Sequence, residues 1–315
     1  MRPFTSRAYL PAGIALLFGI GVLHAGQQVV PVETPEAFEP SEVNWFKSFF
    51  SSAEYNAEET YVGGAEVRRG NRTVSDFDES DTIVELIFTP RISYGVLRLG
   101  AEWERFSFGF SSAAVLPNTL QSINLVAGLD TEYSESIIIR VEALPGVYGT
   151  NHLGIETVNV PVQVGGTYIF SPDLQIIAGV SIDVERKYPI LPGGGIRWRL
   201  HRQWVLNAVL PKPRLEFEAN DNLDFYVGAN LKQTNFRVDE HFGDANNIPR
   251  LNNAVLTYSE VRTGIGFDWK ISPNMYLTGE AGYQPYRNFD FYRAEVRYHQ
   301  DGGAPYGTIS LRGAF

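Results

Sequence analysis

The stretch LDFYVGANLK, residues 223–232, alternates apolar and polar side chains without a break. Its odd-numbered positions are apolar from Leu223 to Leu231, and its even-numbered positions run from Asp224 to Lys232 and include no aliphatic side chain. Successive side chains of a β-strand point to opposite faces of the sheet. The stretch therefore predicts a strand with one apolar face and one polar face.

The same alternation recurs from about Glu59 to Phe315, for example in VRTGIGFDWK (261–270) and MYLTGEAGY (275–283). The segments begin near residues 57, 81, 95, 119, 136, 157, 173, 194, 204, 213, 222, 255, 274 and 306. An even number of antiparallel strands, each about ten residues long, is typical of bacterial outer-membrane barrels. The pattern predicts an all-β fold, a transmembrane antiparallel up-and-down β-barrel of about 14 strands, with 12 as the alternative.

Turn lengths also follow a barrel pattern. Tight turns are expected at Ser171–Asp173, His201–Gln203, Asn220–Asn222 and Ser272–Asn274, and long connections at 108–118, 146–156, 235–253 and 293–305. If Phe315 lies on the periplasmic side, strand alternation places every tight turn beside it and every long connection outside, as in outer-membrane barrels. We expect the acidic loop 235–253, with Asp239, Glu240 and Asp244, to be exposed and available for ligand or phage contact.

The N-terminus carries an export signal. Arg2 and Arg7 precede the apolar run AGIALLFGIGVL (12–23), and a small residue, Ala25, ends it. This order is typical of a secretory signal peptide, and the run is too short for the alternative, a membrane anchor helix. We predict a cleaved signal peptide at 1–25, a periplasmic N-terminal tether at 26–56 and a barrel at 57–315, located in the bacterial outer membrane.

Composition excludes several classes of protein. The formal net charge of -10 argues against a nucleic-acid partner, whose phosphates need a basic patch. The chain has no cysteine, so it has neither disulfides nor thiolate metal sites. His241 lies in the acidic stretch VDEHFGDANN, but the spacing fits no calcium loop, and a solvated loop is the better interpretation. We predict no metal and no cofactor.

The last residues, GTISLRGAF (307–315), alternate and end on an aromatic side chain. They resemble the terminal strand of bacterial outer-membrane barrels, in which the final Phe is the signal read by the barrel-assembly machinery. The resemblance implies that Phe315 is an assembly signal. It also implies that the barrel-assembly machinery, outer-membrane lipid and lipopolysaccharide are partners.

A second resemblance lies in GGIRWRLHRQWVLNAVLPKPRLEFEANDNLDFYVG, residues 194–228. It is similar to an uncharacterised family of bacterial outer-membrane β-barrel proteins, a domain of unknown function. In that family a Leu-Pro-x-Pro step between two short strands is followed by a strand that begins with Leu and carries aromatic residues. The resemblance covers residues 60–315 and implies the fold without an activity.

Alternation assigns many charged side chains to the lumen, where they avoid lipid. The basic ones are Arg98, Arg140, Arg197, Arg199, Arg214, Lys232, Arg262, Lys270 and Arg312. The acidic ones are Glu102, Glu104, Glu142, Asp183, Glu185, Glu216, Glu218, Asp224, Glu260, Asp268 and Glu280. The two signs nearly balance, which is unlike the rings of one sign found in selective channels.

A balanced lumen fits two functions. Either the charges line a porin-like pore or transporter for small polar solutes, or they pair and close a structural or binding barrel, such as an adhesin or surface receptor. Inward glycines, among them Gly264 and Gly266, favour an open lumen because they add no side-chain volume, although glycines also relieve curvature at barrel bends. The chain has no G-x-S-x-G, H-E-x-x-H or phosphate-loop motif, so an enzyme is not predicted.

Overall fold

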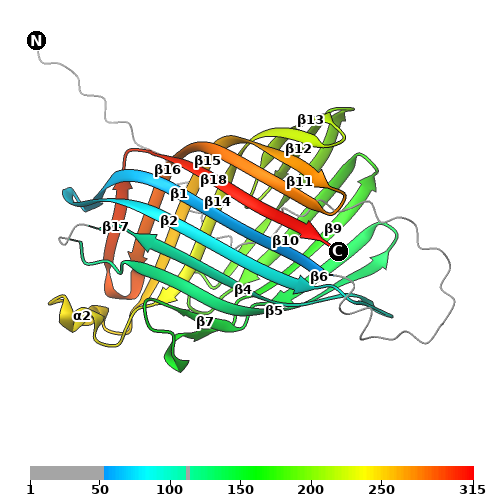
Figure 1. The fold of residues 1–315 in the computed structure, drawn as a ribbon. Coiled ribbons are helices and arrows are strands. Elements are labelled where there is room, and N and C mark those ends of the chain that lie inside the picture. The colour runs from blue at the N-terminus through cyan, green and yellow to red at the C-terminus, as the bar shows by residue number, and fades with distance from the viewer. Residues whose placement is uncertain (1–52, 111–113) are drawn as a thin grey trace, which may run out of the picture.

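A computed structural model describes residues 53–110 and 114–315, and these form a closed antiparallel β-barrel of fourteen wall strands (Figure 1). The barrel closes where β1 (Ala53–Arg69) pairs with both β2 (Arg72–Phe88) and β18 (Ala304–Ala314). The predicted fold class and strand number are therefore confirmed. The predicted signal peptide and all but the last residues of the predicted tether lie outside the described residues.

Some wall strands consist of two consecutive segments. The remaining segments are β3 (Arg91–Ile92), β4 (Gly95–Phe108), β5 (Thr119–Ser134), β6 (Ile137–Ala143), β7 (Gly146–Gly149), β8 (Val158–Asn159), β9 (Val162–Ser171), β10 (Leu174–Ile182), β11 (Ile190–His201), β12 (Trp204–Val209), β13 (Arg214–Asn220), β14 (Leu223–Arg237), β15 (Val255–Ser272), β16 (Met275–Phe291) and β17 (Val296–Asp301). β6 and β7 both pair with β5, and β17 and β18 both pair with β16, so each of these couples forms a single wall strand. In the same way β8 pairs with β7 and β9 with β6.

Short helical turns occur only between strands in the described part of the chain. They are α2 (Phe242–Ala245), η2 (Ile155–Thr157), η3 (Pro249–Leu251) and η4 (Tyr292–Ala294). None of the described helices has the length and apolar character needed to cross a membrane. In Figure 1 the C-terminus lies at one end of the barrel and α2 at the other, which we call the C-terminal end and the α2 end.

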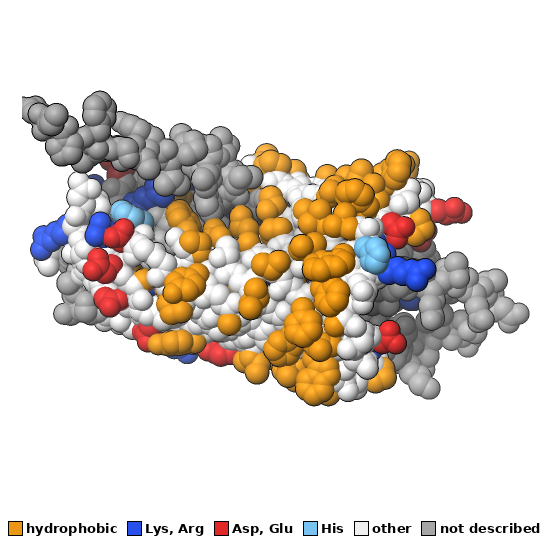
Figure 2. Space-filling model, turned by 90° about the horizontal axis from the view of Figure 1, so that it is seen from above, with side chains coloured by type: hydrophobic (Ala, Val, Ile, Leu, Met, Phe, Trp, Pro, Cys, Tyr) orange, Lys and Arg blue, Asp and Glu red, His pale blue; other side chains and the backbone are white. Residues whose placement is uncertain are grey.

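The outer face of the barrel wall is apolar. Ile265 and Leu125 are 68% and 61% exposed, and Trp198 and Trp269 are also exposed although they are large aromatic residues. Figure 2 shows hydrophobic side chains spread over the middle of one face, with Lys, Arg, Asp and Glu gathered toward the two ends. This separation follows from the alternation, because one side of each strand points away from the barrel interior.

The α2 end of the lumen is filled by side chains. A buried aromatic cluster comprises Phe77, Phe106, Phe108, Tyr148, Phe236, Tyr258, Phe289, Phe291 and Tyr298. Its rings pack closely, with centroids 5.3 Å apart for Phe108 and Phe289 and 4.8 Å apart for Phe106 and Tyr258. Aromatic side chains thus occupy inward positions at this end and fill space that an open pore would need.

The loop between β14 and β15 covers this cluster. Leu251 is fully buried and Val238 is 1% exposed, and both belong to the same core. Glu240 and Asp244 face outward, as expected for the acidic loop. The loop is therefore both an exposed surface and a lid whose apolar residues seal the α2 end.

Candidate functional site

A short hairpin interrupts the barrel wall. β12 and β13 have 6 and 7 residues, whereas their neighbours β11 and β14 have 12 and 15. The two short strands are joined by Leu210-Pro211-Lys212-Pro213, in which neither proline can donate a ladder hydrogen bond. The Leu-Pro-x-Pro step thus lies where β12 ends and β13 begins, short of the length that the neighbouring strands reach.

Beyond this hairpin, β14 has a free edge. Its register with β13 ends at Gly228, and the amides of Ala229 and Leu231 then donate to the carbonyls of Pro213 and Pro211, both over 2.9 Å. In the described part of the chain, the next strand contact on that side is a single parallel bridge between Arg237 and Gly149. The amides of Gln233 and Asn235 point to the same side as those of Ala229 and Leu231, because alternate residues of a strand share a hydrogen-bonding edge.

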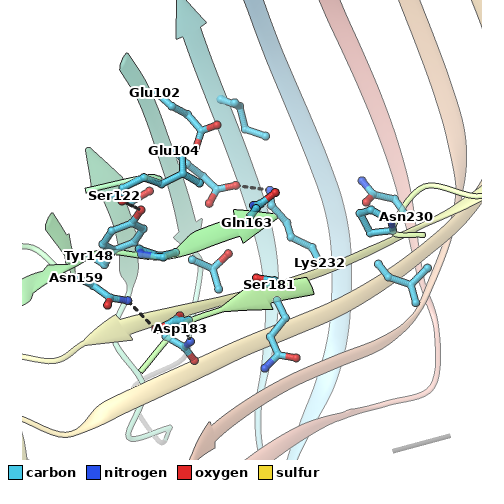
Figure 3. Close-up of a pocket in the computed structure, with 18 of the residues that line it drawn as sticks. Glu102, Glu104, Ser122, Tyr148, Asn159, Gln163, Ser181, Asp183, Asn230 and Lys232 are labelled. Carbon is cyan, nitrogen blue, oxygen red and sulfur yellow. Dashed lines mark hydrogen bonds and ion pairs between the residues drawn. The ribbon is translucent and has the colours of Figure 1, made fainter. Parts of the chain in front are cut away.

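An internal cavity of about 90 Å³ lies beside this edge (Figure 3). It is bounded by β14, by the hairpin residues Pro211 and Lys212, and by inward side chains of strands from β1 to β10. The polar residues that line it are Asn56, Glu58, Glu102, Glu104, Ser122, Tyr148, Asn159, Gln163, Ser181, Asp183, Arg186, Lys212, Asn230, Lys232, Gln233, Thr234 and Asn235. Amides and hydroxyls therefore outnumber charges around the cavity.

Lys232 separates the cavity from the aromatic cluster. Its ammonium donates to Asp81 Oδ2 over 2.9 Å, forms an ion pair with Glu104, and lies 4.6 Å from the centre of the Phe106 ring. Figure 3 shows Lys232 and Glu104 reaching toward each other from opposite walls. Lys232 is 7% exposed, so its charge is compensated by protein groups instead of water.

A central ion-pair network continues from Lys232 across the lumen. Arg262 Nη2 contacts Glu79 at 3.3 Å, Asp81 at 2.9 Å and Glu260 at 2.8 Å. Arg287 Nη1 donates to Glu79 over 2.7 Å. All of these side chains are almost completely buried, so the network joins β2 to β15 and β16 through the barrel interior.

Two further groups of paired charges lie toward the C-terminal end. Arg98 on β4 bridges Glu54 and Glu142, each over 3.0 Å. In the second group, Glu280 on β16 accepts hydrogen bonds from the hydroxyls of Tyr226 on β14, over 2.7 Å, and Tyr306 on β18, over 2.5 Å. None of these six residues lines the cavity.

The loop between β10 and β11 closes the cavity toward the α2 end. Asp183 accepts hydrogen bonds from Asn159 over 3.0 Å and from Asn235 over 2.6 Å. Arg186 donates to Ser181 over 2.9 Å and is 4% exposed. Burial lowers the pKa of the Arg186 guanidinium, and the neighbouring Asp183 partly opposes this effect.

The structure places the sequence-predicted lumen residues as follows. Glu102, Glu104, Asp183 and Lys232 line the cavity, and Glu260 and Arg262 belong to the central network. Arg98 and Glu142 form one pair, and further pairs are Arg140 with Asp130, Arg199 with Glu218, Arg237 with Glu185, and Arg214 and Arg312 with Asp268. Glu280 also pairs with Arg214, and Asn207 donates to Glu216. Among the described residues, Arg197, Asp224 and Lys270 make no ion pair within 4 Å.

Sequence reasoning missed two acidic residues of the central network, Glu79 and Asp81, and one basic residue, Arg287. Glu79 and Asp81 lie in FDESDTIVEL, where Asp78, Ser80 and Thr82 make the opposite face polar too, so the alternation is hidden. Arg287 lies on β16 beyond a register shift in the β15–β16 pairing, which falls between Val261 and Thr263 of β15. This shift reverses the phase of the alternation along β16. The signal that would have found Glu79 and Asp81 is the apolar outward face of Val84 and Leu86, because it assigns the odd-numbered positions of the same strand to the interior.

The inward glycines do not leave open space throughout. A side chain at Gly264 would meet Tyr306 Oη at 2.5 Å, and one at Gly266 would meet Tyr226 Oη at 2.5 Å. The expectation that glycine marks an open lumen is therefore wrong at these two positions. Here glycine makes room for tyrosine rings.

Comparisons with known proteins found one family model and several similar solved structures. A family model described as "Domain of unknown function (DUF6268)" matches residues 90–300, and no curated protein matches the chain. Similar solved structures include the COG4313 outer membrane channel from Pseudomonas putida F1, with 8% identity, 84% of this chain and 96% of that chain covered, and a TM-score of 0.48. Others are the P. putida toluene transporter TodX (8%, 85% and 92%, 0.40) and the KdgM porin (9%, 84% and 99%, 0.32).

Proposed function

Because the chain belongs to the family described as "Domain of unknown function (DUF6268)", a description that names no activity, we propose a function from the barrel and its cavity alone. The protein is a bacterial outer-membrane barrel that passes small polar solutes along a gated path through its lumen. It is exported by a cleaved signal peptide and inserted by the barrel-assembly machinery through its C-terminal strand. Its surroundings are outer-membrane lipid and lipopolysaccharide.

The membrane location is supported by the outer surface. In a closed barrel the wall strands pair with one another, as a lipid environment requires, and the free edge of β14 lies beside the polar cavity. The exposed apolar side chains between two charged ends would match a hydrocarbon layer. A water-soluble barrel would gain nothing from exposing Ile265, Trp198 and Trp269.

The observation that carries the transport proposal is the polar cavity inside the barrel. It lies at the free edge of β14 and is lined by groups that can replace the water around a solute. The aromatic cluster and the β14–β15 loop block the α2 end above it, so passage requires these parts to move. We therefore propose a gated path and not a permanently open pore.

A second candidate function is a closed barrel that binds a ligand without transporting it. It is favoured by the central ion-pair network, which joins β2 to β15 through the lumen with Arg262 at 1% exposure. Opening a path past this network would break several buried ion pairs. Leaving one such charge buried without its partner costs on the order of 3–5 kcal/mol.

Conductance of purified protein in planar bilayers distinguishes the two functions. We expect the natural protein to open rarely, and a variant with residues 239–253 replaced by a short Gly-Ser linker to open often, because Leu251 no longer seals the aromatic cluster. Folding of the variant is checked by its heat-dependent mobility in electrophoresis. If neither protein conducts at any voltage or salt concentration, and neither lets a sugar enter liposomes, transport is excluded in favour of the closed barrel.

A further inference from the structure

We propose that the cavity beside the free edge of β14 binds an uncharged, hydroxyl-rich solute the size of a small polyol or a monosaccharide. This proposal rests on the proposed function, because it names the class of solute that the lumen admits. It is drawn from the hydrogen-bonding groups of the cavity, from their charges and from the volume between them.

The first argument is that several cavity side chains have no hydrogen-bond partner. Asn56, Ser122, Asn230, Gln233 and Thr234 make no side-chain hydrogen bond to any described residue. Ser122 is 1% exposed and Asn230 faces it across the cavity in Figure 3. Of the five, only Ser122 is buried, and the other four are partly exposed while lining the cavity. Their donors and acceptors are therefore available to a molecule in the cavity that both donates and accepts hydrogen bonds.

The backbone gives a second, independent argument. The amides of Gln233 and Asn235 point away from β15 at the place where β13 has already ended. Unpaired strand backbone inside a membrane protein is tolerated where it lines a polar cavity. A hydroxyl can accept from such an amide and donate to a neighbouring carbonyl, so hydroxyl-rich solutes match a strand edge well.

The charges around the cavity disfavour an ion. Lys232 is held by Asp81 and Glu104, and Asp183 is held by Asn159 and Asn235. Two charged lining residues, Glu58 and Lys212, make no hydrogen bond or close ion pair with the described residues, and they have opposite signs. An ionic solute would have to leave water and gain no net opposite charge in return.

The volume sets the size of the solute. About 90 Å³ is several times the roughly 10–15 Å³ that a cavity needs to hold one water molecule, so the cavity has room for a small molecule. This matches a chain or ring of several hydroxyl-bearing carbons. A disaccharide would not fit unless the walls moved apart.

The test uses the full-length protein in detergent micelles with D-xylose as the probe, observed by saturation-transfer NMR. Asn230→Leu and Ser122→Ala each remove hydrogen bonds to the solute, and we expect each to weaken xylose binding about five- to tenfold. Asn207→Leu is the matched control, because it makes the same change on the inward face of β12 outside the cavity. It should leave binding unchanged.

Competing solutes separate the possible outcomes. The proposal is overturned if gluconate or lysine binds more tightly than xylose, or if neither Asn230→Leu nor Ser122→Ala weakens xylose binding. It is also overturned if a Glu58→Gln, Lys212→Met double variant abolishes binding, because the site would then recognise a zwitterion. Xylose binding without entry of xylose into liposomes would keep this site and refute transport. Entry that the two cavity variants leave unchanged would keep transport and refute the site.

Discussion

Arg262 on β15 donates a hydrogen bond from Nη2 to Oδ2 of Asp81 on β2 over 2.9 Å. The two strands are not neighbours in the wall, since β16, the β17–β18 strand and β1 lie between them. The contact therefore passes through the lumen and fixes two parts of the wall at one distance. The interior of this barrel therefore contributes to its stability.

We expect Arg262→Met to destabilise the barrel by about 3–5 kcal/mol, because it leaves Glu79, Asp81 and Glu260 buried with too few positive charges. Urea unfolding in detergent, followed by tryptophan fluorescence, measures the change. Arg199→Met is the control, since Arg199 pairs with Glu218 at 2.6 Å but its side chain is 38% exposed. It should cost no more than about 1 kcal/mol. Equal losses of unfolding free energy in the two variants would mean that the buried central network stabilises the barrel no more than an exposed ion pair does.

Phe315 gives a prediction about assembly. Its backbone exchanges hydrogen bonds with Ala53, over 2.7 and 2.9 Å, and its ring lies 6.2 Å from that of Tyr55. Deleting Phe315 removes both the ring and the backbone bonds that finish the seam between β1 and β18. We expect the deletion to lower the amount of folded protein in the outer membrane, measured by heat-dependent mobility of membrane fractions.

Phe315→Ala separates the two contributions, because it keeps the backbone bonds and removes the ring. If the ring is the assembly signal, Phe315→Ala should assemble as poorly as the deletion but refold normally from urea in detergent. Normal assembly of Phe315→Ala in cells would limit the role of this residue to closing the seam.

The topology of the barrel can be tested with tags. Asn247 is exposed and has a positive φ of 58°, so a short insertion there extends an existing turn. We expect an epitope after Asn247 to be detected on intact cells, and one in the tight turn after Asp221 only after permeabilisation. The reverse pattern would place the α2 end in the periplasm.

The sequence predicted the barrel well because its signal is local. A strand in a barrel wall has one face outside and one inside, so each strand carries its own evidence of alternation. β12 and β15 begin at Trp204 and Val255, where they were expected. β2 begins at Arg72 instead of near residue 81, because its first residues, RTVSDFDESD, are polar on both faces.

The candidate site was less predictable because it depends on which strands lie opposite each other. Alternation assigned Lys232 and Glu104 to the interior, but nothing in the sequence pairs β14 with β4 across the lumen. The cavity depends on β12 and β13 being short. The sequence LPKP predicts a turn between β12 and β13. It does not predict how far the neighbouring strands extend beyond that turn, because their lengths depend on how the whole barrel closes.

The inward glycines give a last prediction, because they decide between an open and a packed lumen near the C-terminal end. Gly266 lies beneath the ring of Tyr226, which is itself 5% exposed, and the Tyr226 hydroxyl is held by Glu280. Gly266→Ala would place a methyl group against this ring. We expect it to cost about 1–3 kcal/mol in unfolding free energy, as overpacking of a filled interior does.

Gly307→Ala is the matched control, because a methyl group there would meet only Glu280 O, at 3.9 Å. It should leave the unfolding free energy unchanged, measured by the same urea titration in detergent. If Gly266→Ala instead stabilises the barrel and lowers its conductance, the glycine keeps space for solute, and the tyrosine moves aside in the conducting state. Where Gly266→Ala destabilises the barrel as expected, adding Tyr226→Leu should restore the lost stability only if the new methyl group and the tyrosine ring are in contact.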